Sequence, residues 1–139
     1  MSDFDVGEFL ARPLTARVAT DGPTVRPTWY LWEDGAFWIL SGPWSRLPAR
    51  IRMRPRVALT VDVCELDTGV VRQVVASGNA DLRPFDVPRG RRKLERYLGV
   101  DEERWDPRFR AYLHDDPGVL WVHLRPARLV AKDLSYRTA

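Results

Sequence analysis

The order of apolar and polar residues along the chain predicts a mainly β protein. Segments of alternating apolar residues, rich in valine, threonine and aromatic side chains and bounded by Gly, Pro or Asp, are typical of strands. They cover residues 14–20, 24–33, 36–40, 56–65, 70–82 and 119–124, with a further strand piece at 128–134. Helical spacing predicts short helices over residues 3–11, 46–53, 89–98 and 107–114. About six strands joined as antiparallel hairpins, with a helix after the third and one or two before the last, favour a β-barrel over a parallel sheet.

Proline and glycine modify two of these strands. Pro27 cannot donate a ladder hydrogen bond, so the strand at 24–33 is expected to lie at a sheet edge or to carry a bulge. The Asp-Gly pair at 34–35 is a strong signal for a two-residue hairpin. In the long strand at 70–82, the Ser-Gly-Asn at 77–79 predicts a bulge or a close approach of a ligand or of partner backbone.

The segment 36–61 carries the clearest chemical signal. A strand runs into a turn of small and hydroxyl-bearing residues at 41–45, and a short basic helix with Arg46 and Arg50 follows. Turn amides, serine hydroxyls, a helix N-terminus and arginine side chains all bind phosphate or another small anion. Tryptophans at 29, 38 and 44 offer planes for an aromatic ligand. A plain hairpin-to-helix connection with solvated arginines accounts for the same spacing, so both interpretations stay open.

Tryptophan is abundant, with six residues, and aromatic side chains occur on both faces of the strand at 24–33. Alternation places Trp29 and Leu31 on one face and Tyr30 and Trp32 on the other. One face can fill the barrel, whereas the other needs cover from a ligand or from a second subunit. This pattern predicts a dimer independently of any motif.

Composition and charge exclude several classes of protein. The 139 residues, 45% hydrophobic and 29% charged, are enough for one domain, 1–139, and too few for two. The net charge is +3, but acidic residues are spread along the whole chain, so a nucleic-acid partner is not expected. The one cysteine, Cys64, excludes an intrachain disulfide and a cysteine-rich metal site. His114 and His123 have no clustered partners in the sequence, so no metal is expected.

The chain also lacks the sequence signals of export and of membrane insertion. The N-terminus has no basic region followed by a long apolar core, which a signal peptide would have. No apolar run reaches roughly 18 residues, the length that spans a membrane. We therefore expect a cytoplasmic protein without a membrane partner.

Taken together, the motifs resemble one known family. Their order is ARVAT, an Asp-Gly turn, VRPTWYLWE, an Asp-Gly hairpin, FWILSG, S-x-x-x-x-R-I-x-x-R-P-R-V-A-L and a long strand with SGNADL. This order is similar to that of the pyridoxamine 5′-phosphate oxidase-like proteins, the flavin/deazaflavin oxidoreductase split β-barrels, from about Leu14 to Asp133. The resemblance implies a six-stranded antiparallel split barrel that forms a homodimer, with FMN or the deazaflavin coenzyme F420 bound at the subunit interface.

The resemblance also implies which residues bind the cofactor. The strand at 24–33 would line the edge of the ring system, the turn at 41–45 would contact the ring, the ribityl chain and the phosphate, and two arginines would neutralise the phosphate. The long strand would approach from another side, and Trp105, Phe109 or Trp121 would close the cleft, from this subunit or from its partner. The implied cofactor-binding residues are Arg26, Pro27, Thr28, Trp29, Leu40, Ser41, Gly42, Trp44, Ser45, Arg46, Arg50, Ser77, Gly78 and Trp105.

One position departs from the family pattern. The family commonly reads S-x-K-x-x-N-[IL]-x-x-[ND]-P after the turn. Ser45 and Pro55 match this pattern, but Leu47 stands where the phosphate-binding lysine is usual. Arg46 and Arg50 could replace the lost charge, because arginine pairs with phosphate bidentately. Alternatively, the site has ceased to bind a flavin phosphate.

The resemblance implies an oxidoreductase that transfers hydride between a flavin or deazaflavin and a small conjugated or aromatic substrate. In such a site the cofactor carries the hydride, and the protein binds and orients it. No catalytic nucleophile is therefore expected, and no catalytic residue is assigned. The alternative is a non-catalytic flavin-binding or small-ligand-binding protein of the same fold, which the substitution at Leu47 favours.

Overall fold

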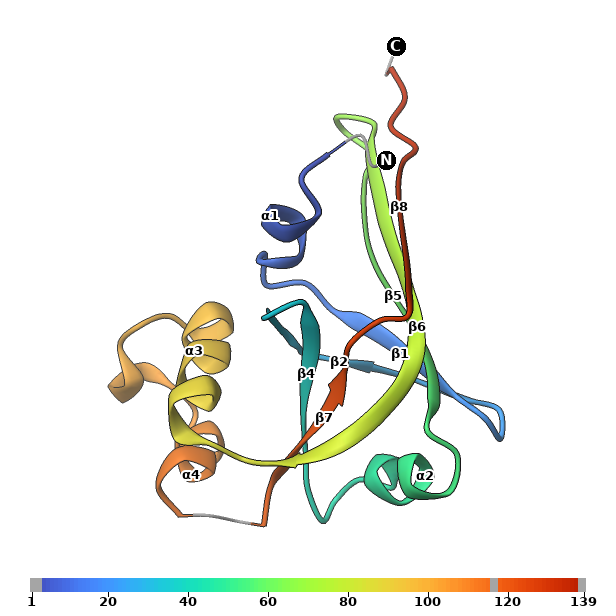
Figure 1. Cartoon of the computed structure of the whole chain (residues 1–139). Helices are drawn as coiled ribbons and strands as arrows, with labels where there is room; N and C mark the ends of the chain where they lie inside the picture. The colour runs from blue at the N-terminus through green and yellow to red at the C-terminus, as the bar shows by residue number, and fades with distance from the viewer. Residues whose placement is uncertain (1–3, 116–117, 138–139) are drawn as a thin grey trace.

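The computed structural model describes residues 4–115 and 118–137, which fold around an antiparallel sheet (Figure 1). The elements follow in the order α1 (Val6–Leu10), β1 (Ala16–Thr20), β2 (Thr24–Thr28), β3 (Leu31–Glu33), β4 (Ala36–Ser41), α2 (Leu47–Met53), β5 (Arg56–Glu65), β6 (Val70–Pro84), α3 (Val87–Leu98), a 3₁₀ turn (Glu102–Arg104), α4 (Pro107–His114), β7 (Leu120–Leu124) and β8 (Arg128–Asp133). The prediction of a mainly β, antiparallel fold is confirmed. The count of six strands was wrong, because the described residues form eight.

Two interruptions account for the additional strands. The predicted strand at 24–33 breaks between β2 and β3, which lie at opposite ends of the strand order β2-β1-β5-β6-β7-β4-β3. The segment 125–127 separates β7 from β8, and β8 pairs with β6. Because different strands end the order, the sheet is open and the expected barrel is not closed. The edge position predicted from Pro27 is confirmed, since β2 is an end strand.

Strand β6 joins the two halves of the sheet. It is 15 residues long, curves through the molecule (Figure 1), and pairs with β5 and β8 in its first part and with β7 in its last. The β5–β6 ladder continues through 77–79 without a change of register, so the expected bulge does not form there. Instead, a Cβ on Gly78 would lie 3.0 Å from the backbone nitrogen of Ala127, which donates a hydrogen bond of 2.9 Å to the Ser77 carbonyl. The close backbone contact at Gly78 is therefore made by the chain's own β7–β8 connection, and the approach of a ligand or partner stays a prediction.

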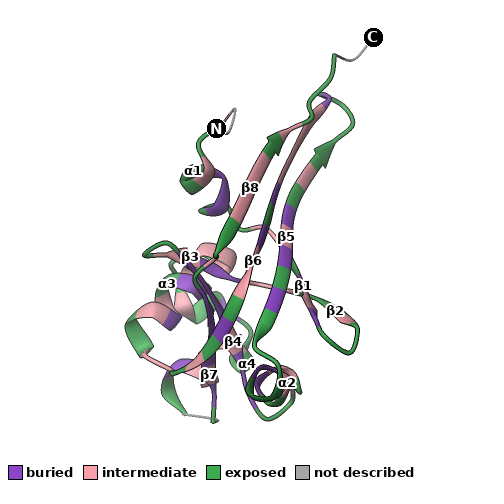
Figure 2. Cartoon of the chain, turned by 45° about the vertical axis from the view of Figure 1, so that its right-hand side comes forward, coloured by how far each residue is buried: buried purple, intermediate pink, exposed green. Residues whose placement is uncertain are grey.

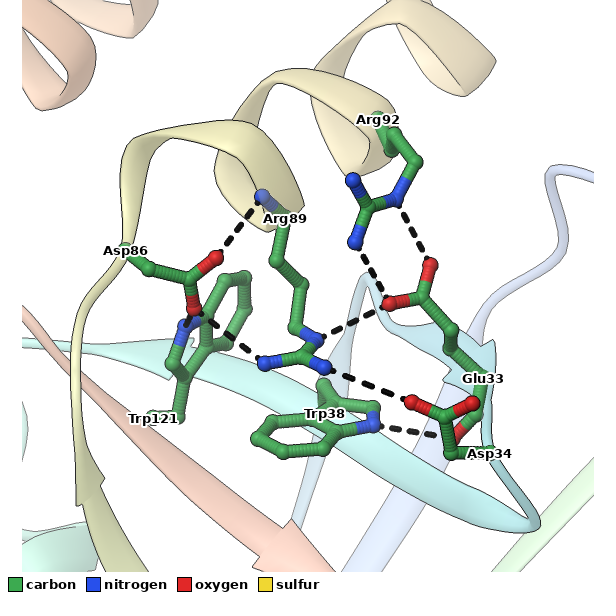
Figure 3. Close-up of polar contacts among 7 residues, drawn as sticks. All are labelled: Glu33, Asp34, Trp38, Asp86, Arg89, Arg92 and Trp121. Atoms are coloured by element: carbon green, nitrogen blue, oxygen red, sulfur yellow. Dashed lines mark hydrogen bonds and ion pairs between the residues drawn. The ribbon is translucent and has the colours of Figure 1, made fainter.

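The predicted Asp-Gly hairpin forms between β3 and β4. Asp34 and Gly35 both adopt positive φ angles, 56° and 71°, and Glu33 pairs with Ala36 across the two-residue loop. These angles suit a type I′ turn, which requires positive φ at both central residues. The hairpin places Glu33 and Asp34 at the end of the sheet that faces α3 (Figure 3).

The core lies between the inward faces of the strands, which Figure 2 shows as buried stretches alternating with exposed ones. Its largest fully buried side chains include those of Phe37, Leu10, Val61, Val74 and Leu124. These come from α1 and from strands of both halves of the sheet. One continuous cluster therefore holds both halves together.

The helices follow the predicted segments closely. α4 has the predicted bounds, and α2 starts one residue later than expected. α3 begins two residues earlier than expected, because Asp86 accepts a hydrogen bond from the Arg89 amide as its N-cap and Pro88 fits the first turn. No helix in the described part of the chain is long and apolar enough to cross a membrane.

Helices α3 and α4 cover the aromatic face of the predicted strand at 24–33. The sequence pattern predicted that a ligand or a second subunit would cover this face. Trp29 stacks on Tyr97 of α3 at a ring-centroid distance of 4.3 Å, and on Phe109 of α4 at 5.4 Å. Leu31 lies buried in a cluster with Trp121. The cover expected from a ligand or a second subunit thus comes from the same chain, so this face gives no support for a dimer.

Candidate functional site

A cavity of about 570 Å³ opens between the β1–β2 hairpin, the end of β4 and the start of α2. This volume lies in the range of small-molecule sites. Its lining residues are Val18, Thr20, Thr24, Val25, Arg26, Pro27, Thr28, Ile39, Leu40, Ser41, Trp44, Ser45, Arg46, Leu47 and Arg50.

The turn after β4 shapes one wall of this cavity. The Ser45 amide donates a hydrogen bond of 3.0 Å to the Gly42 carbonyl, and the Ser45 hydroxyl accepts one of 3.1 Å from the Leu47 amide. Pro48 occupies the first turn of α2. α2 thus starts at the cavity and presents Leu47 and Arg50 to it. The helix has only seven residues, and the Ser45 hydroxyl already accepts a hydrogen bond from one of its first amides. Its N-terminus therefore has fewer free amides to bind an anion than the sequence suggested.

The charge of the cavity is positive. Arg26, Arg46 and Arg50 line it, and no aspartate or glutamate of the described residues does. Within residues 4–115 and 118–137, none of these three side chains has an ion-pair or hydrogen-bond partner. Uncompensated guanidinium groups at the wall of a cleft raise the local concentration of anions and pair with phosphate or carboxylate.

One lining residue carries a buried hydroxyl. Ser41 is 2% exposed, lines the cavity, and its Oγ is buried without a hydrogen-bond partner in the described structure. A buried polar group without a partner costs stability, so native proteins rarely keep one without a reason. By contrast, the Thr20 and Thr24 hydroxyls on the opposite wall hydrogen-bond each other. Ser41 therefore keeps an unsatisfied hydroxyl among the residues that line the cavity.

The mouth of the cavity is apolar and aromatic. Val25 and Trp44 are 66% and 58% exposed, which is unusual for such side chains. The Trp44 ring packs directly over Gly42, where a Cβ would collide with it. An exposed indole plane next to arginines suits a ligand that combines a flat ring system with an anionic group.

The structure brings most of the predicted cofactor-binding residues together and leaves some elsewhere. Those that line the cavity are Arg26, Pro27, Thr28, Leu40, Ser41, Trp44, Ser45, Arg46 and Arg50. Those that do not line it are Trp29, Gly42, Ser77, Gly78 and Trp105. Gly42 is buried beneath Trp44, and Ser77 and Gly78 lie against the β7–β8 connection.

Trp105 and Trp121, which were expected to close the cleft, are buried, and Trp29, which was expected to line the ring edge, is partly buried. The Trp105 indole donates a hydrogen bond of 2.9 Å to the Gly99 carbonyl and packs with Leu94 and Leu113 between α3 and α4. Trp121 is fully buried, and Trp29 is enclosed by the α3 and α4 rings. Their contact with a cofactor remains a prediction from the resemblance.

Several lining residues were not among the predicted cofactor-binding residues. These are Val18, Thr20, Thr24, Val25, Ile39 and Leu47. Thr20 and Thr24 face each other across the Asp21–Pro23 turn, and that hairpin was predicted. What the pattern could not reveal is that this hairpin stands beside the end of β4, because β2 and β4 share no ladder.

A second group of charged residues lies between α3 and the β3–β4 hairpin (Figure 3). Glu33 accepts hydrogen bonds from Arg89 at 3.0 Å and from Arg92 at 2.8 Å, and Asp86 accepts from Arg89 at 3.2 Å. The Arg89 guanidinium also lies 3.7 Å from the centre of the Trp38 ring. Hydrogen bonds from Arg92, and further those from Arg89, lower the pKa of Glu33 although burial raises it. The donors and acceptors of this group satisfy one another, which indicates a structural role.

Two further buried groups lie away from the cavity. Burial, with the nearby Arg96 charge, lowers the pKa of Lys93 to about 7. Burial also lowers the pKa of His123, whose Nδ1 lies 3.3 Å from the Asp81 carboxylate. Neither residue lines the cavity, so neither is placed to act on a ligand bound there.

Comparison with known proteins gives a match in structure but not in sequence. No protein-family model matches the chain, and no curated protein matches it. The conserved hypothetical protein Rv2991 from Mycobacterium tuberculosis is similar, with a TM-score of 0.77 and 23% identity over 100% of this chain and 92% of that chain. An F420 reductase is similar with a TM-score of 0.59 and 23% identity, covering 88% of this chain and 94% of its own.

A protein from Listeria innocua assigned as a pyridoxamine 5′-phosphate oxidase is also similar. Its TM-score is 0.59 at 16% identity, and the match covers 88% of this chain and 90% of that one. The chain therefore has the fold of the pyridoxamine 5′-phosphate oxidase-like split barrels, as the motif order predicted. At this level of identity the likeness concerns the fold.

Proposed function

We propose that the cavity binds a flavin-type cofactor with an anionic tail, FMN or coenzyme F420, and that the protein is an oxidoreductase acting on a small conjugated or aromatic molecule. The observation that carries the proposal is the lining itself. Among the described residues, three arginines without carboxylate partners line one cavity of about 570 Å³, together with Ser41, whose buried hydroxyl has no partner. A phosphorylated ring compound would satisfy all of these groups at once.

The described residues fit such a cofactor. Arg46 and Arg50 would neutralise the phosphate, Trp44 would lie against the ring, and Ser41 would bind a polar ring atom. When bound, a flavin or deazaflavin supplies hydride transfer. The chain's own task would be to bind and orient it and to exclude water. The names of two structural neighbours, an F420 reductase and the Listeria protein, are consistent with this class of chemistry.

A second candidate is a binding protein of the same fold without turnover. Leu47, at the position of the usual phosphate-binding lysine, lines the cavity and adds no charge to it. In the part of the chain that the structure describes, the lining also contains no His, Asp, Glu, Lys, Tyr or Cys that could move a proton. The rate at which reduced cofactor bound to the protein is reoxidised would distinguish the two candidates. Reoxidation accelerated by a quinone acceptor supports the oxidoreductase, and binding without acceleration supports the binding protein.

Titration of the full chain with FMN and, separately, with F420 tests binding directly. One of the two cofactors is expected to quench tryptophan fluorescence at micromolar concentration, because Trp44 lines the cavity. The same titration of Trp44→Phe should lose much of the quenching while binding persists by flavin fluorescence. Absence of binding by both cofactors would overturn the proposal.

We further propose that the protein is a homodimer with one domain per chain. Val25, Ala58 and Val75 are exposed on the same outer face of the sheet, beside the cavity strand β2. Exposed apolar side chains gathered on one face occur at interfaces between subunits. Sedimentation equilibrium should give twice the mass of the chain, and Val75→Glu should shift it to the monomer. A monomeric wild-type protein would contradict this part of the proposal.

A further inference from the structure

Helix α4 contacts the cavity walls at two places without lining the cavity. Near its start, Phe109 stacks on Trp29 with a ring-centroid distance of 5.4 Å and an interplanar angle of 18°. One turn later, Tyr112 stacks on Trp44 at 5.5 Å and 26°. Phe109 and Tyr112 meet each other edge to face at 6.1 Å. Four rings thus form one connected row.

Of the two outer rings of this row, Trp29 adjoins one wall of the cavity and Trp44 belongs to another. Trp29 directly follows Thr28, the last residue of β2 and part of the lining. Trp44 belongs to the turn that follows β4 and lines the cavity itself. Since β2 and β4 are not hydrogen-bonded to each other, α4 links two walls that the sheet leaves unconnected.

The opposite side of α4 is held independently of the cavity. Leu113 is buried in a cluster with Leu94 of α3 and Trp105. Glu102 accepts a hydrogen bond of 2.9 Å from Arg91 of α3 and bonds to His114 at the end of α4. The position of Tyr112 is therefore set by α3 and the 3₁₀ turn, whether or not a ligand is bound.

Trp44 itself has little else to fix it. Its side chain is 58% exposed, and an exposed side chain on a turn can populate several rotamers. Gly42 supports one part of the ring and Tyr112 stacks on it. Aromatic stacking is directional, so the Tyr112 ring selects one orientation of the indole.

We propose that Tyr112 is a positioning residue that holds the Trp44 indole as the aromatic wall of the cavity, so that α4 decides the preference for a planar ring ligand over a bare anion. The identity of the ring ligand rests on the proposed function. The position of Trp44 does not, and it can be tested without a ligand.

The ligand-free test uses fluorine NMR of the full chain labelled with 5-fluorotryptophan, with the Trp44 signal assigned through Trp44→Phe. Tyr112→Ala should shift or broaden the Trp44 signal, and Tyr112→Phe, which keeps the stacked ring, should leave it in place. Tyr136→Ala, an exposed tyrosine beyond β8, is the matched control and should change nothing. An unchanged Trp44 signal in Tyr112→Ala overturns the inference whatever the protein binds.

The ligand test compares FMN with inorganic phosphate. Tyr112→Ala removes one aromatic contact. The variant should therefore bind FMN about three- to tenfold more weakly than the wild type and bind phosphate equally well. Tyr112→Phe should restore the wild-type affinity. An equal loss for both ligands, or no rescue by phenylalanine, overturns the assigned role. If Tyr112→Ala does not fold, Tyr112→Leu keeps apolar volume without a stacking ring and carries the same expectation.

The two tests separate this inference from the proposed function. If the wild-type chain binds neither FMN nor F420, the proposed function fails, and the Trp44 signal still decides whether Tyr112 positions the indole. If FMN binds but Tyr112→Ala binds it as the wild type does, the proposed function stands and the inference fails.

Discussion

Two groups of arginines in this protein have opposite surroundings. Between α3 and the β3–β4 hairpin, Arg89 and Arg92 share the Glu33 carboxylate, and Arg89 also binds Asp86 (Figure 3). At the cavity, the arginines of β2, the turn and α2 have no carboxylate among the lining residues. Both groups come from one chain in which basic and acidic residues are nearly balanced, 22 against 19.

The difference separates charges that hold the fold from charges available to a ligand. Arg89 is only 20% exposed and lies against Trp38, so it needs a counter-charge within the fold. Arg26 and Arg46 are exposed, and Arg50 is partly buried, so water can solvate them until an anion binds. The same residue type therefore stabilises the protein in one place and prepares a binding site in the other.

The largest effect is expected from Glu33→Ala. This change leaves Arg89 and Arg92 without their shared carboxylate, and we expect the free energy of unfolding to fall by roughly 2–3 kcal/mol. Urea denaturation measures it. In contrast, Arg50→Ala should alter stability by no more than about 0.5 kcal/mol, because its side chain has no partner to lose. Equal destabilisation by both variants would remove the distinction between the two groups.

Arg50→Ala should act on binding instead. Loss of a charged hydrogen bond to an anionic cofactor should weaken FMN affinity by roughly 1.5–3 kcal/mol. The matched control is Arg54→Ala at the end of the same helix, outside the cavity lining, which should leave the affinity unchanged. Fluorescence titration measures both. If the two variants weaken binding alike, only the general charge of α2 matters and the assigned phosphate contact is wrong.

A pH series should sharpen the contrast. The pKa of Glu33 is lowered in the folded protein, so its ionised form stabilises the fold above the usual carboxyl pKa, and this stabilisation is lost as the pH falls through the folded-state value. The difference in unfolding free energy between wild type and Glu33→Gln should therefore be full near neutral pH and shrink below about pH 4 to 5. A difference independent of pH would show that Glu33 acts only through packing.

The smallest effect is expected from Ser41→Ala. The Ser41 hydroxyl has no partner in the described structure, so its removal should change stability by less than about 1 kcal/mol. Affinity for FMN should fall by about 0.5–1.5 kcal/mol, the scale of a neutral hydrogen bond. Thermal unfolding and titration of the same sample give both values. A large loss of stability with unchanged affinity would assign Ser41 to the fold instead of the site.

Much of the fold could be predicted from local patterns. Pro27 indicated an edge strand, the Asp-Gly pair at 34–35 indicated the β3–β4 hairpin, and the residues of α4 were identified with their correct bounds. These features depend on backbone geometry within a few residues, which side-chain chemistry restricts directly. The break between β2 and β3 was missed, because Trp29 and Tyr30 have side chains that are typical of strands. In the structure both residues lie outside the ladder and contact Tyr97 of α3.

The candidate site was only partly predictable for the same reason. The turn at 41–45 and the arginines of α2 are close in sequence, so their chemistry could be assigned together. Trp29 and Trp105 were assigned to the cleft from the family resemblance, but α3 and α4 enclose them. Aromatic side chains serve a core and a ligand site equally well, and which of the two they serve depends on helices far away in the sequence.

Residue chemistry alone therefore predicted an antiparallel β fold and a turn next to arginines that could bind an anion, and the resemblance of the motif order to a known family predicted the split-barrel type. Tertiary structure decided which arginines have counter-charges and which do not. It also decided that the β1–β2 hairpin forms the second wall of the cavity, and that Tyr112 lies against Trp44. Ion pairs and ring contacts between elements require distances of a few ångströms between residues that are tens of positions apart. Only the packed core sets those distances.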